Sequence, residues 1–382
     1  IFLGRTFECD SDTRGSSPKP TFLSLVFFFL LVFLQNVMGA IPADVGVEVC
    51  STLKRSTETE WKTTHVSDFS AEGGGCLSSM LVVRAKAANI DEEQQFVLKL
   101  QPQNAEAKQI VEDMGWFQCE AAFYSWISQE SSRKLFFTPQ FHGIVSLPAP
   151  LGSGMLLQFI DSPGLKKPDL LQGLRREEAL ICLRALASLH MTPVSQELRS
   201  ALPQEKNRAG LVKDMGLGGA KDYRVKYGAE HKELADVLER EIDALIQVLE
   251  NSDEEDRADD VLLHGDCWSQ NFLLPENDSE LPALLDFQCV SFGHPALDIG
   301  FLILSSMNPK DRRNSYREMV DAYNGAVDSC RTTSGRRTRM AEVGEWPLQV
   351  RRFLAFQMVA GGTDIFDRCP ERIHEAIKDL LC

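Results

Sequence analysis

Three short apolar runs, each joined to a polar residue, constrain the fold of this chain more than any other feature. Residues 261–287 read VLLHGDCWSQNFLLPENDSELPALLDF. VLL leads into His264-Gly265-Asp266, FLL follows Asn271, and ALL leads into Asp286. Apolar runs of this length between turn residues are typical of short strands. The segment therefore predicts short hairpin strands that present polar side chains at a cleft.

The polar residues at these strand ends match the needs of one reaction. Phosphoryl transfer from ATP requires a carboxylate that orients an acceptor hydroxyl and accepts its proton. It also requires an amide oxygen and a second carboxylate to hold the magnesium that neutralises the phosphates. Asp266, Asn271 five residues later and Asp286 fifteen residues after that have the spacing of the kinase catalytic loop and its metal-binding aspartate. An ordinary β-turn with polar residues is the alternative.

The motif H-G-D-x-W-x-x-N followed by D-F-Q resembles the aminoglycoside phosphotransferase and choline kinase superfamily. Within it, Trp268 and the D-F-Q variant look most like the CHK kinase-like (ecdysteroid kinase-like) family. The resemblance covers roughly residues 60–370 and is highly specific only at 261–298. It implies an α+β, two-lobed protein-kinase-like fold, with a small β-rich N-lobe and a larger, mainly helical C-lobe. It also implies that Asp266 is the catalytic base and that Asn271 and Asp286 bind Mg²⁺.

A lysine and a glutamate in the N-terminal half fit the same arrangement. Lys99 lies in the apolar strand FVLKL, and Glu120 lies on a helix expected from about Asn104 to Ser128. The helical neighbours of Glu120 at minus four, minus three, plus three and plus four are all aromatic, so its carboxylate should be buried. A buried charge is costly without a partner. We therefore expect a Lys99–Glu120 ion pair, with Lys99 at the ATP phosphates, although a lysine in such a strand is usually at an edge or snorkelling.

Four further residues are expected to contact the nucleotide. Gly74 and Gly75, with Ser78 before the strand at 80, fit a loop that covers phosphates, although glycine runs are most often plain turns. Gln158 stands in the segment that the resemblance makes the inter-lobe hinge. Family members often carry an acidic residue near this position, but adenine contacts here would come mainly from the backbone, so this departure bears on detail rather than on the class of protein.

The same resemblance implies structural roles for two more residues. Asp298, in the helix start Pro295-x-x-Asp298, should brace the catalytic loop. His190, at the end of a helix expected over 169–190, is read as a hydrogen-bonded core histidine rather than a metal ligand.

Three segments make up the expected domain organisation. Residues 1–37 contain the apolar run FLSLVFFFLLVFL and precede the first methionine, Met38, so we interpret them as extraneous sequence or, alternatively, a signal-like segment. Residues 38–160 should form the N-lobe, with strands over 80–88, 95–101 and 154–159. Residues 161–382 should form the C-lobe, with helices over 169–190 and 229–250.

Composition limits the partners and the compartment. The net charge of −15 argues against a nucleic-acid partner, which would need a basic surface. The 13-residue apolar run is too short to span a bilayer, so we expect no stable membrane association. Ten scattered cysteines without a C-x-x-C pair indicate reduced thiols, and we expect a cytoplasmic protein unless residues 1–37 act as a signal. The sequence does not predict the oligomeric state.

The acceptor is expected to be a small molecule. Only eight residues, 287–294, separate Asp286 from Pro295, where the next helix should begin. That is too short for the peptide platform of a protein kinase, and no A-P-E follows. The long segment 191–260 would wall an acceptor pocket by the resemblance. The predicted function is a kinase that transfers the ATP γ-phosphate to a metabolite hydroxyl, choline-like, sterol or other. The alternative is a catalytically silent nucleotide-binding module.

Overall fold

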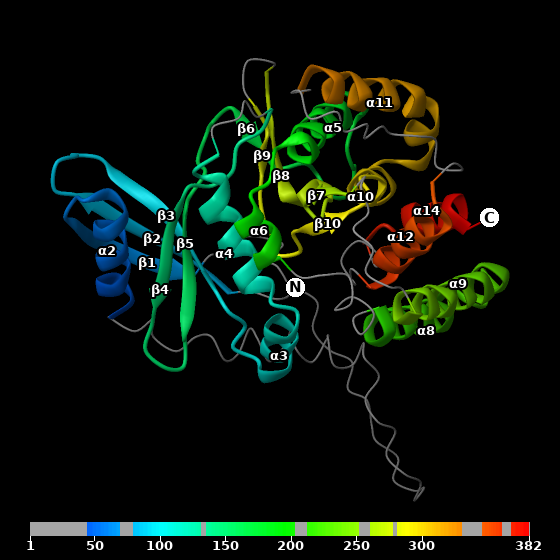
Figure 1. Cartoon of the computed structure of the whole chain (residues 1–382), viewed down its shortest axis with the longest axis horizontal. Coiled ribbons are helices and arrows are strands. Elements are labelled where there is room, and N and C mark those ends of the chain that lie inside the picture. Colours follow the sequence, from blue (N-terminus) through cyan, green and yellow to red (C-terminus); the bar gives the residue numbers. More distant parts are fainter. Residues whose placement is uncertain are drawn as a thin grey trace, which may run out of the picture. The chain divides into compact units, whose positions relative to one another are not determined.

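An antiparallel sheet of five strands forms most of the N-terminal part of the computed structural model (Figure 1). Its strand order is β1-β2-β3-β5-β4. The bounds are β1 Trp61–Asp68, β2 Ser79–Ala87, β3 Glu93–Leu100, β4 Phe141–Ser146 and β5 Ser153–Gln158. The structure describes residues 44–68, 79–130, 135–202, 212–251, 260–277, 281–330, 346–360 and 368–381.

The two faces of this sheet pack against different helices. Phe96, Leu98 and Leu100 alternate along β3 and join a core with helix α2 (Asp44–Thr57). Val97 lies on the opposite face and packs against the core that contains helix α4 (Trp116–Ile127). Figure 1 shows α2 and α4 on opposite sides of the sheet. The alternation of β3 therefore directs the side chain of Lys99 to the face that α4 covers.

The helix expected from Asn104 to Ser128 is two helices. Helix α3 spans Ala105–Asp113, and α4 begins at Trp116. Gly115 separates them, and its φ of 64° is left-handed. Glycine adopts this conformation at little steric cost and commonly ends helices for that reason. The apolar spacing continued across the break, which is why the pattern alone predicted one helix.

Most of the chain after β5 is helical. The order of a β-rich part followed by a helical part is confirmed. The expected boundary at 160/161 lies two residues beyond Gln158, the last residue of β5. The helices are α5 Arg176–Met191, α6 Gln196–Ala201, the π-helix η1 Val212–Gly216, α8 Leu217–Tyr227, α9 Lys232–Asn251, α10 Ala296–Ser306, α11 Pro309–Cys330, α12 Leu348–Ala360 and α14 Pro370–Leu381. Within the described ranges, no helix is long and apolar enough to cross a membrane.

Helix α5 starts seven residues later than expected, at Arg176 rather than 169. The Asp169 carboxylate accepts hydrogen bonds from the backbone N–H groups of Leu171 and Gln172, which stabilises a turn in place of a helix. Gly173 follows with a φ of 72°, and its left-handed conformation ends that turn.

The three apolar runs within residues 261–287 are short strands, as predicted. They are β7 Val261–Leu263, β8 Phe272–Pro275 and β9 Ala283–Leu284. Strand β7 pairs with β10 (Ser291–Gly293), and β8 lies between β9 and β6 (Leu165–Lys166). Between β7 and β8 lies the 3₁₀ turn η2 (Ser269–Asn271). These pairings place the polar residues at the strand ends beside one another.

Candidate functional site

Lys99 forms the centre of a buried group of charges. Its Nζ atom lies 2.6 Å from Oε2 of Glu120 on α4 and 2.7 Å from Oδ1 of Asp286, after β9. Lys99 is 7% exposed and Glu120 is 1% exposed. The predicted Lys99–Glu120 ion pair is therefore confirmed, and the contact with Asp286 is additional to it. One ammonium group joins the N-terminal sheet to the end of β9.

The charge of Lys99 is maintained despite its burial. Burial alone would lower the pKa of Lys99, but the carboxylates of Asp286 and Glu120 raise it above its ordinary value. Burial raises the pKa of Glu120, and the ammonium of Lys99 opposes that rise. The cluster is thus a cation held between two carboxylates, which suits a lysine that exchanges one partner for phosphate oxygens.

Helix α4 also supports the backbone of Asp286. The rings of Phe123 and Phe287 stack with centroids 3.8 Å apart and an interplanar angle of 17°, and Tyr124 packs edge-on against Phe287. Asp286 has a φ of 60°, an unusual value for a residue with a side chain. A strained backbone of this kind persists only where its surroundings fix it, and it is common at functional sites. Phe123 and Tyr124 supply that support here.

Asp266 and Asn271 are brought together by the turn η2. The Nδ2 atom of Asn271 donates to the backbone oxygen of Asp266 at 2.8 Å and to its Oδ2 at 3.1 Å. The carbonyl of Asn271 in turn accepts from the N–H of Leu285 at 2.9 Å, one residue before Asp286. The three polar residues predicted from the strand ends therefore lie in one connected group.

Asp266 has the ionisation behaviour of a general base. Burial and, to a smaller extent, the nearby charge of Asp286 raise its pKa to about 7, against the opposing effect of the hydrogen bond from Asn271. A carboxylate with a pKa close to neutral pH is well matched to accepting a proton from a hydroxyl group.

The loop that carries Asp266 is braced by a buried carboxylate. Asp298, on α10, accepts hydrogen bonds from the N–H groups of His264 at 2.7 Å and Gly265 at 2.9 Å. His190 Nε2 lies 3.1 Å from the same carboxylate, and its Nδ1 lies 2.7 Å from the hydroxyl of Tyr323 on α11. The structure thus shows the bracing contacts expected of Asp298 and a hydrogen-bonded core histidine at 190. Tyr323 was not identified from the sequence, because it lies in no motif.

His264 links the loop to the other strand end. Its Nε2 donates to the carbonyl of Leu285 at 2.8 Å, and its Nδ1 accepts from the N–H of Asp266 at 3.4 Å. Burial lowers the pKa of His264, which is consistent with this neutral tautomer. No role for His264 was drawn from the sequence, although it stands inside the motif.

Gly265 has a conformation that only glycine adopts readily. Its φ is 83°, and a methyl group added at its Cα would lie 2.0 Å from the carbonyl oxygen of Cys289. The close approach lets the loop lie directly against the segment after Asp286. A side chain at position 265 would push the two apart.

The donor atoms of Asn271 and Asp286 fit a magnesium ion. Asn271 uses its Nδ2 toward Asp266, so its Oδ1 is turned away from that carboxylate. Asp286 shares Oδ1 with Lys99. In the described part of the chain, no group of three or more His, Cys, Asp or Glu side chains is arranged to hold a metal. Magnesium suits two protein oxygens of this kind, because it commonly completes its shell with phosphate oxygens and water.

The remaining predicted nucleotide contacts have different outcomes. Gly74, Gly75 and Ser78 lie outside the described residues, as do residues 1–37. Gln158 is the last residue of β5, and its side chain is exposed and accepts a weak hydrogen bond from the N–H of Gln140 at 3.3 Å. The backbone N–H of Gln158 also donates to the carbonyl of Gln140, at 2.8 Å, so its side chain and its N–H group are both engaged near the start of β4.

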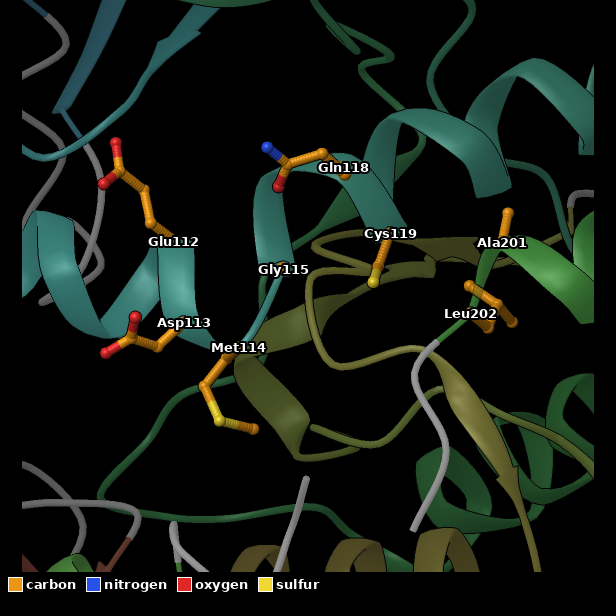
Figure 2. Close-up of a pocket in the computed structure, with 8 residues that line it drawn as sticks. All are labelled: Glu112, Asp113, Met114, Gly115, Gln118, Cys119, Ala201 and Leu202. Atoms are coloured by element: carbon orange, nitrogen blue, oxygen red, sulfur yellow. The ribbon is translucent and has the colours of Figure 1, made fainter. Parts of the chain in front are cut away.

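A pocket opens beside the N-terminal end of α4, but it does not include the charged group. Figure 2 shows Glu112 and Asp113 on α3, Gln118 and Cys119 on α4, and Leu202 at the end of α6. Cys119 is one residue before Glu120, yet Lys99, Asp266 and Asp286 do not line this pocket. The candidate site is therefore the charged group and not this pocket.

Several solved structures resemble this chain. A protein from Ralstonia eutropha described as a candidate aminoglycoside phosphotransferase has a TM-score of 0.53 at 12% identity, covering 87% of this chain and 97% of its own. A microcompartment-associated aminopropanol kinase has a TM-score of 0.49 at 14% identity, covering 87% of this chain and 95% of its own. The GDP and kanamycin complex of APH(2″)-IIIa has a TM-score of 0.47 at 17% identity, covering 87% and 97%.

The likeness to the Ralstonia protein shows the fold, which is the α+β kinase-like fold with a sheet in the N-terminal part and helices in the C-terminal part. No curated protein matches this chain in sequence. The model of the ecdysteroid kinase-like family matches residues 72–334, a span that contains Lys99, Glu120, Asp266, Asn271, Asp286 and Asp298. The chain belongs to the ecdysteroid kinase-like family.

Proposed function

We propose that this protein is a small-molecule kinase that transfers the γ-phosphate of ATP to a hydroxyl group of a metabolite. The observation that carries the proposal is the position of Lys99 between Glu120 and Asp286, at 2.6 and 2.7 Å. A buried lysine paired with a helix glutamate, beside a metal-binding aspartate, is the arrangement that kinases need for phosphate binding. Membership of the ecdysteroid kinase-like family supports the same reading.

Each residue has a defined part in the proposed reaction. Lys99 binds phosphate oxygens of the nucleotide, and Glu120 keeps its ammonium group in place. Asp266 orients the acceptor hydroxyl and accepts its proton, for which its pKa of about 7 is suited. Asn271 and Asp286 would hold Mg²⁺ with their side-chain oxygens. When bound, the ion neutralises charge on the phosphates.

The acceptor in this proposal is a small molecule rather than a protein side chain. Residues 287–294 contain strand β10, which pairs with β7, and lead directly to α10 at Ala296. A stretch of this length gives no platform for a peptide. The helices between α5 and β7 supply a different wall, because α9 and η1 pack against α12, which in turn contacts the catalytic loop. We therefore place the acceptor between these helices and Asp266.

The proposed compartment is the cytoplasm. Cys119, Cys182 and Cys267 are buried free thiols, and burial raises the pKa of each. Thiols that are neutral and buried are typical of proteins in a reducing compartment. The net charge of −15 supports a small-molecule substrate over a nucleic acid.

A phosphate-transfer screen tests the proposal. The purified protein is incubated with γ-³²P-labelled ATP, Mg²⁺ and a panel of hydroxylated metabolites that includes choline-like amines and sterols. We expect labelled product with at least one acceptor, and none with Asp266→Asn. ATP binding by the intact protein without transfer to any acceptor would instead indicate a nucleotide-binding module. Labelling of protein serine or threonine without a metabolite response would indicate a protein kinase.

A further inference from the structure

Gln357, on helix α12, contacts the catalytic loop through its side-chain amide. Its Nε2 atom donates a hydrogen bond to the carbonyl oxygen of Gly265 at 3.2 Å. That carbonyl belongs to the peptide group that joins Gly265 to Asp266. Because a peptide group is planar, fixing its oxygen also fixes the direction in which the chain enters Asp266.

Three elements thus hold Gly265, each through a different group. The carboxylate of Asp298 accepts from its N–H at 2.9 Å. The Cys289 carbonyl occupies the space where a side chain would stand. Gln357 takes the one remaining backbone group, the carbonyl. The first two contacts position the glycine, and the third acts on the peptide that precedes the base, whose N–H group donates to Nδ1 of His264.

The orientation of the Gln357 amide follows from the same contact. A carbonyl oxygen can only accept, so the NH₂ group must face Gly265. The other amide atom, Oε1, is buried and has no hydrogen-bond partner among the described residues. A buried polar atom without a partner is costly, whereas an apolar residue at this position would avoid that cost. The presence of an amide at position 357 therefore indicates that the hydrogen bond donated by its NH₂ group is functionally important.

Helix α12 is well placed to hold this contact rigidly. Leu354 lies against Gly300 of α10, where an added methyl group would be 2.5 Å from its Cδ1. Phe356 lies against Gly216 of η1, where the corresponding distance is 2.9 Å. Figure 1 shows α12 between α10 and helices α8 and α9. A donor on such a fixed element holds its partner more precisely than one on a loop.

We propose that Gln357 is a positioning residue for Asp266, acting through the Gly265 carbonyl. The inference rests on the proposed function, because it assigns a role relative to the catalytic base. Gln357 ties the catalytic base to α12 and, through α12, to the helices that we place around the acceptor. Among the described residues, its side chain has no hydrogen bond to Lys99 or to the proposed magnesium ligands, so its loss should affect the transfer step and leave nucleotide binding unchanged.

Gln357→Met and Gln357→Glu test the role of the donor. Both keep the length of the side chain and remove the NH₂ group. Arg352→Met is the matched control on the same helix, because it breaks the ion pair between Arg352 Nε and Glu241 Oε2 at 2.7 Å without touching the loop.

The kcat, the KM for ATP and the KM for the acceptor are measured for all four proteins. Both Gln357 variants should lower kcat by about ten- to a hundred-fold, the effect of misplacing a catalytic group. Their KM for ATP should match that of the wild type, and Arg352→Met should keep the wild-type kcat.

Hydrogen exchange of the loop gives a readout that needs no activity. Backbone exchange in a peptide covering residues 261–272 should be faster in both Gln357 variants than in the wild type and in Arg352→Met. Wild-type exchange in both variants would overturn the inference, as would a wild-type kcat in either one. An inactive wild-type protein with the expected exchange pattern would overturn the proposed function alone. Equal effects from Arg352→Met would show that only the docking of α12 matters, and would also overturn the inference.

Discussion

The Nζ atom of Lys99 lies 2.7 Å from Oδ1 of Asp286, although 187 positions separate the two residues in the chain. Lys99 therefore contacts a carboxylate of the C-terminal part as well as Glu120 of α4. The phosphate-binding group and the metal-binding group of the proposed site are in direct contact. In the proposed function, a bound nucleotide with its magnesium ion would replace this contact with bonds to phosphate.

Lys99→Met should abolish most of the stabilisation by ATP and Mg²⁺. It removes the cation and leaves the buried Glu120 carboxylate without its partner, which costs about 3–5 kcal/mol when a buried pair is broken. A ligand at 100 times its Kd stabilises the native state by about 2.7 kcal/mol, and the variant should lose that increment. Thermal melts with and without ATP and Mg²⁺ measure both effects. Lys86→Met is the control, because this half-exposed lysine pairs with the exposed Asp91, at 3.3 Å. A full ligand-induced shift in Lys99→Met would contradict the proposed nucleotide contact.

Asp266→Asn should lower the transfer rate while leaving the fold intact. The amide has the size of the carboxylate but cannot accept the hydroxyl proton, and loss of a general base costs about 10² to 10⁴ in rate. Steady-state kinetics and the thermal midpoint are measured together, with Asp321→Asn on the exposed face of α11 as the control. Turnover within a few-fold of the wild type would rule out Asp266 as the base.

Gly265→Ala should disrupt the catalytic loop. Its methyl group would lie 2.0 Å from the Cys289 carbonyl, and its φ of 83° is unfavourable for alanine. We expect lost activity and a lower free energy of unfolding.

Gly325→Ala is the matched control within α11, because a methyl group there would have no atom within 4 Å apart from the backbone of the helix itself. That control should be stabilised by about 0.5–1 kcal/mol, the usual gain from replacing glycine in a helix. Urea unfolding curves and activity assays separate the two results, and an active Gly265→Ala protein would disprove the tight packing.

Stability should fall at acid pH through His374 on α14. Its Nδ1 lies 2.8 Å from the hydroxyl of Tyr223, and its ring packs on Tyr227 and His231. Burial and the neighbouring His231 lower the pKa of His374 from 6.5 to about 4. Between these values the unfolded chain binds the proton and the folded chain does not, so this contribution to stability is full above pH 6.5 and is lost as the pH falls toward 4.

The test for His374 compares thermal midpoints from pH 7 to pH 4. His374→Gln should show a shallower decline than the wild type, because its side chain does not titrate. His65→Gln, which replaces an exposed histidine of β1, should follow the wild-type curve. Parallel declines of the wild type and His374→Gln would exclude His374 as a source of the acid sensitivity.

Local patterns in the sequence predicted the strand ends around Asp266 and Asp286. Short apolar runs and the polar residues beside them can be recognised without knowing which other parts of the chain they contact. The Lys99–Glu120 pair also followed from local reasoning, since an aromatic surround makes an unpaired carboxylate costly. The break between α3 and α4 at Gly115 could not be predicted from the sequence. A glycine inside a helix costs only about 1 kcal/mol, so it is compatible with one continuous helix or with two helices. Tyr323 contacts His190 and Gln357 contacts Gly265, in each case a residue more than 90 positions away in the chain. The spacing of apolar residues along a helix or strand does not predict contacts of this kind.

The stack of Phe123 on Phe287 has a consequence for anyone who alters this protein. Helix α4 carries Glu120 and Phe123, and the segment it stacks on carries Asp286, so a shift of the helix displaces both charged partners of Lys99 at once. If the proposed function holds, affinity for the nucleotide and affinity for the metal are then not separately adjustable. In a library of α4 variants, we expect the two affinities to rise and fall together.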